Sequence, residues 1–187
     1  MARRTDTRER VVRTAARLFH AQGYHATGLN QVLAEGGAPK GSLYFHFPGG
    51  KEQLAAEAVA LAGAQLCAEL RSALAAEPDP VDALRAVLGL LGAQLLESDF
   101  AHGCPIATVA LDAGAQSEPI RAACAEVYDS WQRAIAEHLD RPDADELAAV
   151  VLATVEGAVL LARTRRDLAP LHAVGARLGV LLGRPTG

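Results

Sequence analysis

The chain has 187 residues; half of them are apolar, only 4% are aromatic, and the net charge is −4. A chain of this length forms one or two domains with a sizeable core, and no useful length of it alternates with a period of two, which predicts an all-α protein. No apolar run follows the first residues, which predicts that there is no signal peptide, and three widely spaced cysteines (Cys67, Cys104 and Cys124) indicate reduced thiols.

The most apolar helix that we expect covers residues 147–162. This stretch is sixteen residues long and contains Glu156, whereas a transmembrane helix needs about twenty predominantly apolar residues. The sequence therefore predicts a soluble, cytoplasmic protein without a membrane span.

The charge is unevenly distributed along the chain. Residues 1–53 hold eight basic and four acidic side chains, a net charge of +4, whereas the remaining residues hold ten basic and eighteen acidic ones, a net charge of −8. This asymmetry indicates a basic N-terminal part that meets DNA and an acidic body that does not. Ordinary sampling variation is the alternative explanation.

The first helix is expected to begin at Asp6, which precedes Glu9 by the spacing of a capping box, and to end at Gly23. Arg3 and Arg4 are expected in a flexible arm before it. The arginines of this helix either form a solvated face or approach the phosphate backbone of DNA. The buried stripe is expected to be Val12, Ala15, Ala16, Leu18 and Phe19.

The stretch that follows predicts a short helix, a glycine turn and a second short helix. The helix before the turn covers residues 28–35, with Thr27 as its N-cap. The glycines at 36–37 then break the apolar periodicity, as the turn of a helix-turn-helix requires. The second helix begins at Pro39 and runs to about residue 45. Its exposed face is expected to carry Lys40, Gly41, Ser42, Tyr44 and His46, while Leu43 and Phe47 turn inward. Such groups suit phosphates and base edges.

Six further helices are expected, with breaks at the prolines and glycines of residues 48–50 and 78–80. The first of the six has Gly50 as its N-cap and is long enough to link two parts of the molecule mechanically. The expected ranges are residues 51–76, 81–97, 105–113, 118–139, 144–166 and 170–182.

Residues 7–59 resemble the DNA-binding domain of the TetR family of bacterial transcriptional regulators. Three segments carry the resemblance in order, namely LFHAQGYHAT, KGSLYFHF and PGGKEQL. Within the family the chain is most similar to the LmrA/YxaF-like branch, which has a similar PKGSLYFHFPGGKEQL run and a GCP tripeptide like residues 103–105.

The resemblance implies which residues of the N-terminal part meet DNA. Lys40, Gly41 and Ser42 match family positions that contact base edges, and Thr27, Tyr44, His46 and Lys51 match positions that hold phosphates. The chain departs from the family pattern at two positions, where Gly28 and Pro39 replace hydroxyl residues that are common in the family. Gly28 removes one candidate hydroxyl contact, and Pro39 removes a side-chain cap of the second helix. In the alternative reading, Tyr44 packs on Phe19 or Leu33 and contacts nothing else.

The resemblance also implies the overall function. We expect a helix-turn-helix domain at residues 1–53 and an effector-binding and dimerisation domain at residues 54–187. Such a homodimer would bind a near-palindromic double-stranded operator and repress transcription until a small hydrophobic or aromatic inducer releases it. The alternatives are an activator of the same family, or an all-α small-molecule-binding or enzymatic protein with a vestigial DNA-binding head.

A glycine stripe near the C-terminus suggests a dimer interface. Gly175, Gly179 and Gly183 stand four residues apart, which lets two helices approach closely, although neutral drift in a glycine-rich chain would give the same pattern. The family uses a four-helix bundle from the last two helices of two subunits. The preceding helix is therefore expected to add Gly157 and Ala158 to the interface.

A ligand pocket is expected where the scarce large side chains of the body lie. Tyr128 and Trp131 share a helix face, and their polar tips suit an amphipathic aromatic ligand, although such a pair also occurs in ordinary cores. Glu156 either orients the ligand or forms an ion pair across the dimer. The expected lining is Phe100, Cys104, Ile106, Leu111, Tyr128, Trp131 and Glu156.

The sequence offers no pattern for catalysis or for a cofactor. His102 and Cys104 are two residues apart, but no further ligands follow at zinc spacing, and no strand precedes the glycine pair as a phosphate-binding loop requires. We therefore expect neither an enzyme nor a metal site.

Overall fold

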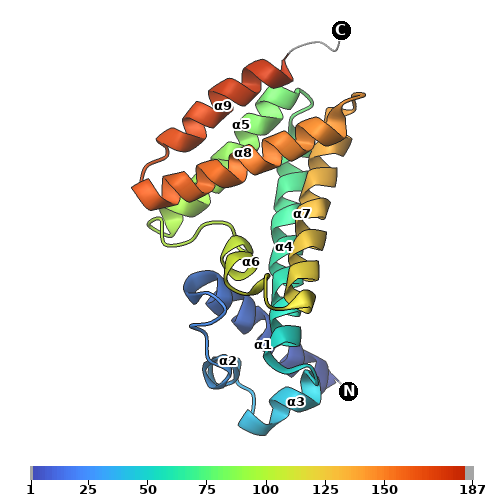
Figure 1. The fold of residues 1–187 in the computed structure, drawn as a ribbon, viewed down its shortest axis with the longest axis vertical. Coiled ribbons are helices and arrows are strands. Elements are labelled where there is room, and N and C mark those ends of the chain that lie inside the picture. Colours follow the sequence, from blue (N-terminus) through green and yellow to red (C-terminus); the bar gives the residue numbers. More distant parts are fainter. Residues whose placement is uncertain (1, 184–187) are drawn as a thin grey trace. The chain divides into compact units, whose positions relative to one another are not determined.

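The computed structural model describes the backbone of residues 2–183 and the side chains of residues 6–183. This part of the chain contains nine α-helices and one short 3₁₀ helix and no strand, which confirms the all-α prediction (Figure 1). The helices divide into two compact units. Unit 1 comprises the residues up to Gln65 together with Pro105–Val127, and unit 2 comprises Leu66–Cys104 together with the residues from Tyr128 onward.

This division differs from the expected boundary at residue 53. That boundary falls inside one continuous helix, α4 (Gly50–Ala76), which contributes its first part to unit 1 and its remainder to unit 2. Helix α7 (Glu118–Leu139) is shared in the same way. Unit 1 is therefore built from two separate stretches of the sequence.

Unit 1 contains the helix-turn-helix and its supports. Its elements are α1 (Ala2–Gln22), α2 (Leu29–Glu35), the 3₁₀ helix η1 (Lys40–Ser42), α3 (Leu43–His46), α6 (Ala107–Ala113) and the first parts of α4 and α7. Apolar side chains of these elements are almost fully buried, which holds the short helices in place. The largest are Leu18, Phe19, Phe47, Leu54, Ile106 and Ile120.

Helix α1 begins earlier than the sequence suggests. It starts at Ala2, so the expected start at Asp6 is wrong, and residues 3 and 4 belong to the helix and not to an arm. Asp6 does not cap the helix; its carboxylate accepts a hydrogen bond from Arg10, one turn further on, at 2.6 Å. Glu9 pairs with Arg13 in the same manner. The apparent capping box is thus a pair of i,i+4 ion pairs.

Unit 2 contains α5 (Pro80–Glu97), α8 (Ala144–Arg165), α9 (Ala169–Leu182) and the remainders of α4 and α7. The expected break before α5 is present, and the Asp79 carboxylate caps the helix by accepting from the amides of Val81 and Asp82 at 2.9 and 3.1 Å. Helices α5, α8 and α9 enclose a shared apolar core. Its members include Leu84, Leu95, Val151, Val155, Val159, Ala162, Leu171 and Leu178.

Two helices, α4 and α8, are long and apolar enough to cross a membrane by length and composition alone. The expectation that the residues around Glu156 form too short a helix for a span is therefore wrong, because α8 has 22 residues. In both helices 39% of the apolar window is buried in the fold, and the core helix of a soluble protein passes the same test.

Candidate nucleic-acid interface

The helix-turn-helix is held by side chains that point into unit 1. Val32 and Leu33 of α2 and Leu43 of α3 are buried, and so is Phe47 just after α3, as the sequence predicts. The turn between the helices contains Gly37, whose φ of +65° lies in the left-handed region that favours glycine. These anchors leave the opposite face of η1 and α3 free for a partner.

The free face of η1 and α3 carries the predicted contact residues and one more. Lys40 and Gly41 are exposed and Ser42 is half-buried. Tyr44 is 70% exposed, so the alternative that it packs on Phe19 or Leu33 is wrong. Phe45, which sequence reasoning missed, is 61% exposed. The inward positions 43 and 47, four residues apart, already place position 45 on the outer side of a helix.

The imidazole of His46 lies between two aromatic rings. Its centroid is 5.0 Å from that of Phe45 and 6.3 Å from that of Phe47, in edge-on and tilted arrangements. These contacts fix the ring at the edge of the exposed face, where a nitrogen can reach a phosphate.

Lys51, in the first turn of α4, is held by an aromatic ring. Its ammonium nitrogen lies 4.3 Å from the centroid of the Tyr24 ring, which is a cation–π contact. Partial burial lowers the pKa of Lys51, and burial together with the charge of Glu52 raises the pKa of Tyr24. Both shifts follow from the close packing of this corner of unit 1.

Thr27 is not a candidate for a phosphate contact in the structure. Its side chain is 0% exposed, and its hydroxyl donates a hydrogen bond to the Gly23 carbonyl at 2.7 Å. The residue before α2 is Gly28, which caps the helix without a side chain, so the expected N-cap role of Thr27 is also wrong. Thr27 closes the end of α1 and is not available to a phosphate.

The arginines of α1 whose side chains are described, those from residue 6 onward, are paired with carboxylates inside unit 1. Arg8 meets Glu57 at 2.7 Å, Arg17 meets Glu35, and Arg10 and Arg13 pair along the helix. Among the lysines and arginines of residues 6–58, those described with their side chains, Lys40 and Lys51 remain without a carboxylate partner. Within residues 6–58, the two cations without a carboxylate partner are thus the two for which the family motif implies a DNA contact.

The expected ligand pocket is only partly assembled. Trp131 and Glu156 line a cavity of about 50 Å³ in unit 2, together with leucines of α4 and α5. Phe100 packs half-buried against the core of α5, α8 and α9. Two expected members do not line this cavity and belong to unit 1: Ile106 is fully buried there, and Leu111 is 81% exposed.

Cys104 and Tyr128, two further expected members, are not among the lining residues of this cavity but lie close to residues that line it. The Cys104 thiol lies 3.9 Å from the Tyr128 hydroxyl and also hydrogen-bonds Glu156, while the Tyr128 ring stands edge-on to Trp131 at 5.5 Å. Burial raises the pKa of the Glu156 carboxyl, which favours its neutral form, against a smaller opposing effect of the Cys104 hydrogen bond.

His138 also lines the cavity, and sequence reasoning missed it. Its Nε2 atom is buried without a hydrogen-bond partner, which is uncommon for a buried polar atom. The signal was present in the sequence, because His138 stands two helical turns after Trp131 on the same face of α7.

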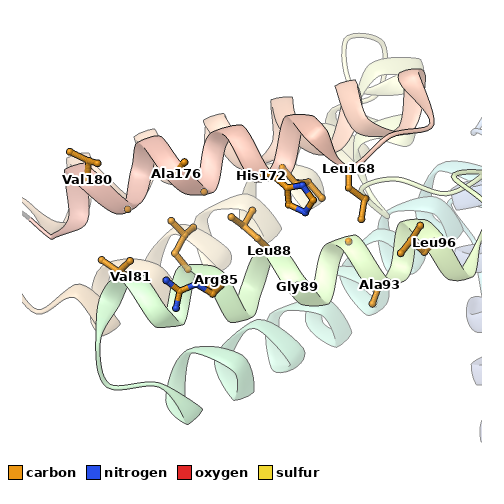
Figure 2. A pocket seen from close by; sticks show the side chains of 15 residues that line it. Val81, Arg85, Leu88, Gly89, Ala93, Leu96, Leu168, His172, Ala176 and Val180 are labelled. Atoms are coloured by element: carbon orange, nitrogen blue, oxygen red, sulfur yellow. The ribbon is translucent and has the colours of Figure 1, made fainter.

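A larger groove of about 790 Å³ opens between α5 and α9 (Figure 2). It is lined mainly by apolar and small residues, with Arg85 and His172 as its polar members. The expected glycine stripe lies here: a Cβ atom at Gly175 would lie 2.8 Å from the Leu88 side chain, and one at Gly179 would lie 3.4 Å from Val81.

The glycine stripe therefore lets α9 approach α5 of the same chain, and its expected role in a dimer interface stays a prediction. Gly183 also faces Val81 of α5, and Ala158 is buried in unit 2. A Cβ atom at Gly157 would have no neighbouring atom within 4 Å.

Nothing in the described part of the chain resembles a metal centre, since residues 6–183 contain no group of three or more potential ligands from His, Cys, Asp and Glu. Two family models match the chain. Residues 11–58 match the model of the tetR family of bacterial regulatory proteins, and residues 80–177 match that of the LmrA/YxaF-like transcriptional regulators, C-terminal domain.

The relatives and the solved structures agree with these matches. The chain is 40% identical to the HTH-type transcriptional regulator LmrA of Bacillus subtilis, over 96% of this chain and 98% of that protein. It is 37% identical to the uncharacterized HTH-type transcriptional regulator YxaF of the same organism, over 97% and 98%. A TetR transcriptional regulator from Chloroflexus aurantiacus has a TM-score of 0.79 at 32% identity, over 98% of both chains. These relatives are transcriptional regulators and not enzymes, and the chain belongs to the TetR family of DNA-binding transcriptional regulators, in its LmrA/YxaF-like branch.

Proposed function

We propose that this protein is a cytoplasmic, ligand-responsive repressor that binds a near-palindromic operator as a homodimer. The observation that carries the DNA-binding half of the proposal is the pair of lysines without carboxylate partners, one on η1 and one on α4. Lysines free of carboxylate partners can replace the counterions of DNA phosphates or bind guanine edges.

The proposed contacts follow from exposure. Lys40, Gly41 and Ser42 read base edges, and Tyr44, His46 and Lys51 hold phosphates. Phe45 joins this surface, where an exposed ring can contact a thymine methyl group or a sugar. The set differs from the sequence-based one by the loss of Thr27 and the gain of Phe45.

The proposed dimer face is the outer side of α8 and α9. Large apolar side chains are exposed there at helical spacing, and Gly157 leaves room among them for a close approach. An exposed apolar patch of this kind marks an interaction site in a soluble protein. These exposed side chains are Val150, Leu160 and Leu161 of α8 and Val180 and Leu181 of α9, and Val180 also borders the groove between α5 and α9.

Leu160→Asp tests this face, because it places a charge in the middle of the patch. We expect the dimer dissociation constant to rise at least about tenfold, since an unpaired carboxylate would be buried at the interface. Analytical ultracentrifugation measures the change. Leu111→Asp is the matched control, since Leu111 is also an exposed leucine but lies on α6. A Leu160→Asp protein that stays as dimeric as the control contradicts the proposed interface.

The proposed inducer site is the cavity beside Trp131, Glu156 and His138. Its volume of about 50 Å³ has room for little more than a water molecule, so an inducer must select a state in which the cavity is wider. Helix α4 contributes Leu66, Leu70 and Leu74 to this cavity and also carries Lys51. The same helix is therefore the expected route from inducer to DNA contact.

The function is tested by fluorescence anisotropy of a labelled duplex from upstream of the protein's own gene, across a salt series. We expect saturable nanomolar binding that weakens steeply with salt, and much weaker binding to a random duplex of equal length. Equal, weak binding to all duplexes would favour the alternative of a vestigial head. Operator position relative to the promoter distinguishes a repressor from an activator.

A further inference from the structure

Asp112 of helix α6 is bonded to the loop between α1 and α2. Its Oδ2 atom accepts a hydrogen bond from the Tyr24 amide at 3.0 Å. Its main-chain carbonyl, in the last turn of α6, lies 2.9 Å from His25 Nε2, which can donate to it. The loop between α1 and α2 is thus held by a residue that follows it by nearly ninety positions, and all three residues belong to unit 1.

The shape of the loop accommodates this carboxylate. Gly23 has a φ of +84°, and a Cβ atom at this position would lie only 2.4 Å from Asp112 Oδ2. Any side chain there would displace the carboxylate as well as strain the backbone. The glycine that ends α1 therefore also makes the space in which Asp112 binds.

The residue held by Asp112 is the one that holds Lys51. The Tyr24 ring lies beneath the Lys51 ammonium at 4.3 Å, and it is wedged between Phe19 and His25 at centroid distances of 5.8 and 5.2 Å. Movement of the Tyr24 backbone therefore moves the ring on which the lysine rests. Asp112 is itself half-buried and lies on α6, not on the free face of η1 and α3.

We infer that Asp112 is a positioning residue of the DNA-binding surface: it fixes Tyr24 and, through the Tyr24 ring, places the Lys51 ammonium against a phosphate. The inference rests on the proposed phosphate contact of Lys51. Helix α6 thereby determines whether the contact between Lys51 and a phosphate forms. This helix belongs to a segment of unit 1 whose two ends continue into unit 2.

The test compares Asp112→Ala with Asp112→Asn in the full-length protein, on the same labelled upstream duplex and a random duplex. Alanine removes the acceptor, whereas the asparagine oxygen can still accept from the Tyr24 amide. We expect alanine to weaken binding about two- to tenfold and asparagine to stay within about twofold of the wild type. We also expect the slope of log K against log salt to become shallower by about one for alanine, as for Lys51→Ala.

The salt slope separates positioning from general damage. A variant that only folds less well lowers the concentration of active protein and leaves the slope of the remainder unchanged. The Asp112→Ala, Lys51→Ala double variant should bind about as weakly as Lys51→Ala alone, because both changes remove one contact. A wild-type slope for Asp112→Ala, or losses that add in the double variant, would overturn the inference. Failure of the wild type to bind the upstream duplex more tightly than the random one would instead count against the proposed function.

Discussion

Lys40→Ala is expected to weaken operator binding by about 1–3 kcal/mol, roughly 5- to 150-fold, and to relax the base preference at one position of each half-site. Lys40 is exposed at the start of η1, and no carboxylate in the described part of the chain pairs with it, so the variant should fold as the wild type does. The loss comes from a base-edge contact, most simply to guanine O6 and N7.

The comparison with Lys51→Ala distinguishes a base-edge contact of Lys40 from a phosphate contact. A lost phosphate contact weakens binding to all sequences about equally and makes the salt dependence shallower, whereas a lost base contact changes the ranking of operator variants. Anisotropy with a panel of single-base operator variants measures both. If Lys40→Ala lowers affinity equally for every variant, Lys40 binds the backbone and does not read sequence.

Trp131→Ala is expected to destabilise unit 2 by about 3–5 kcal/mol, since it removes the largest fully buried side chain of the described residues. Trp131 is 1% exposed, and the space it leaves would join the small cavity beside Glu156. Thermal and urea unfolding measure the loss.

Indole provides the matching control for Trp131→Ala. A cavity lined by apolar groups binds a small aromatic molecule that fits it, so indole should raise the melting temperature of Trp131→Ala and leave that of the wild type unchanged. Tyr128→Phe removes only a hydroxyl from the neighbouring ring and should have a much smaller effect. A loss below about 1 kcal/mol for Trp131→Ala would mean that its ring is not part of the core.

Local sequence patterns predicted the ends of helices correctly where the pattern fitted only one structure. Helix α7 has both ends where the sequence places them, and the proline break with Asp79 marks the start of α5 to within one residue. The start of α1 was missed because Asp6 and Glu9 fit two local patterns, a capping box and a series of i,i+4 ion pairs. Only the helical backbone before Asp6 distinguishes the two.

Where the expected site residues and the structure differ, the causes are long-range contacts. The hydroxyl of Thr27 can cap the helix that follows or bond back to Gly23, and the direction depends on how α1 ends. The glycine stripe of α9 indicates a close neighbour without naming it, and the neighbour is α5 of the same chain. Ile106 and Leu111 follow Cys104 in the sequence, yet they belong to unit 1, which no local pattern reveals.

Because unit 1 is built from two separate segments of the chain, it cannot be completed early in synthesis, and it cannot be exchanged between regulators as one piece. The nascent chain cannot complete the DNA-binding unit when residue 65 leaves the ribosome, because Ile106 and Ile120, both fully buried, belong to its second segment. About two thirds of the chain must emerge first. For the same reason, a chimera made by a single crossover after α3 would combine one regulator's recognition surface with another's α6. Three crossovers, after residue 65, before residue 105 and after residue 127, are needed to transfer the whole unit.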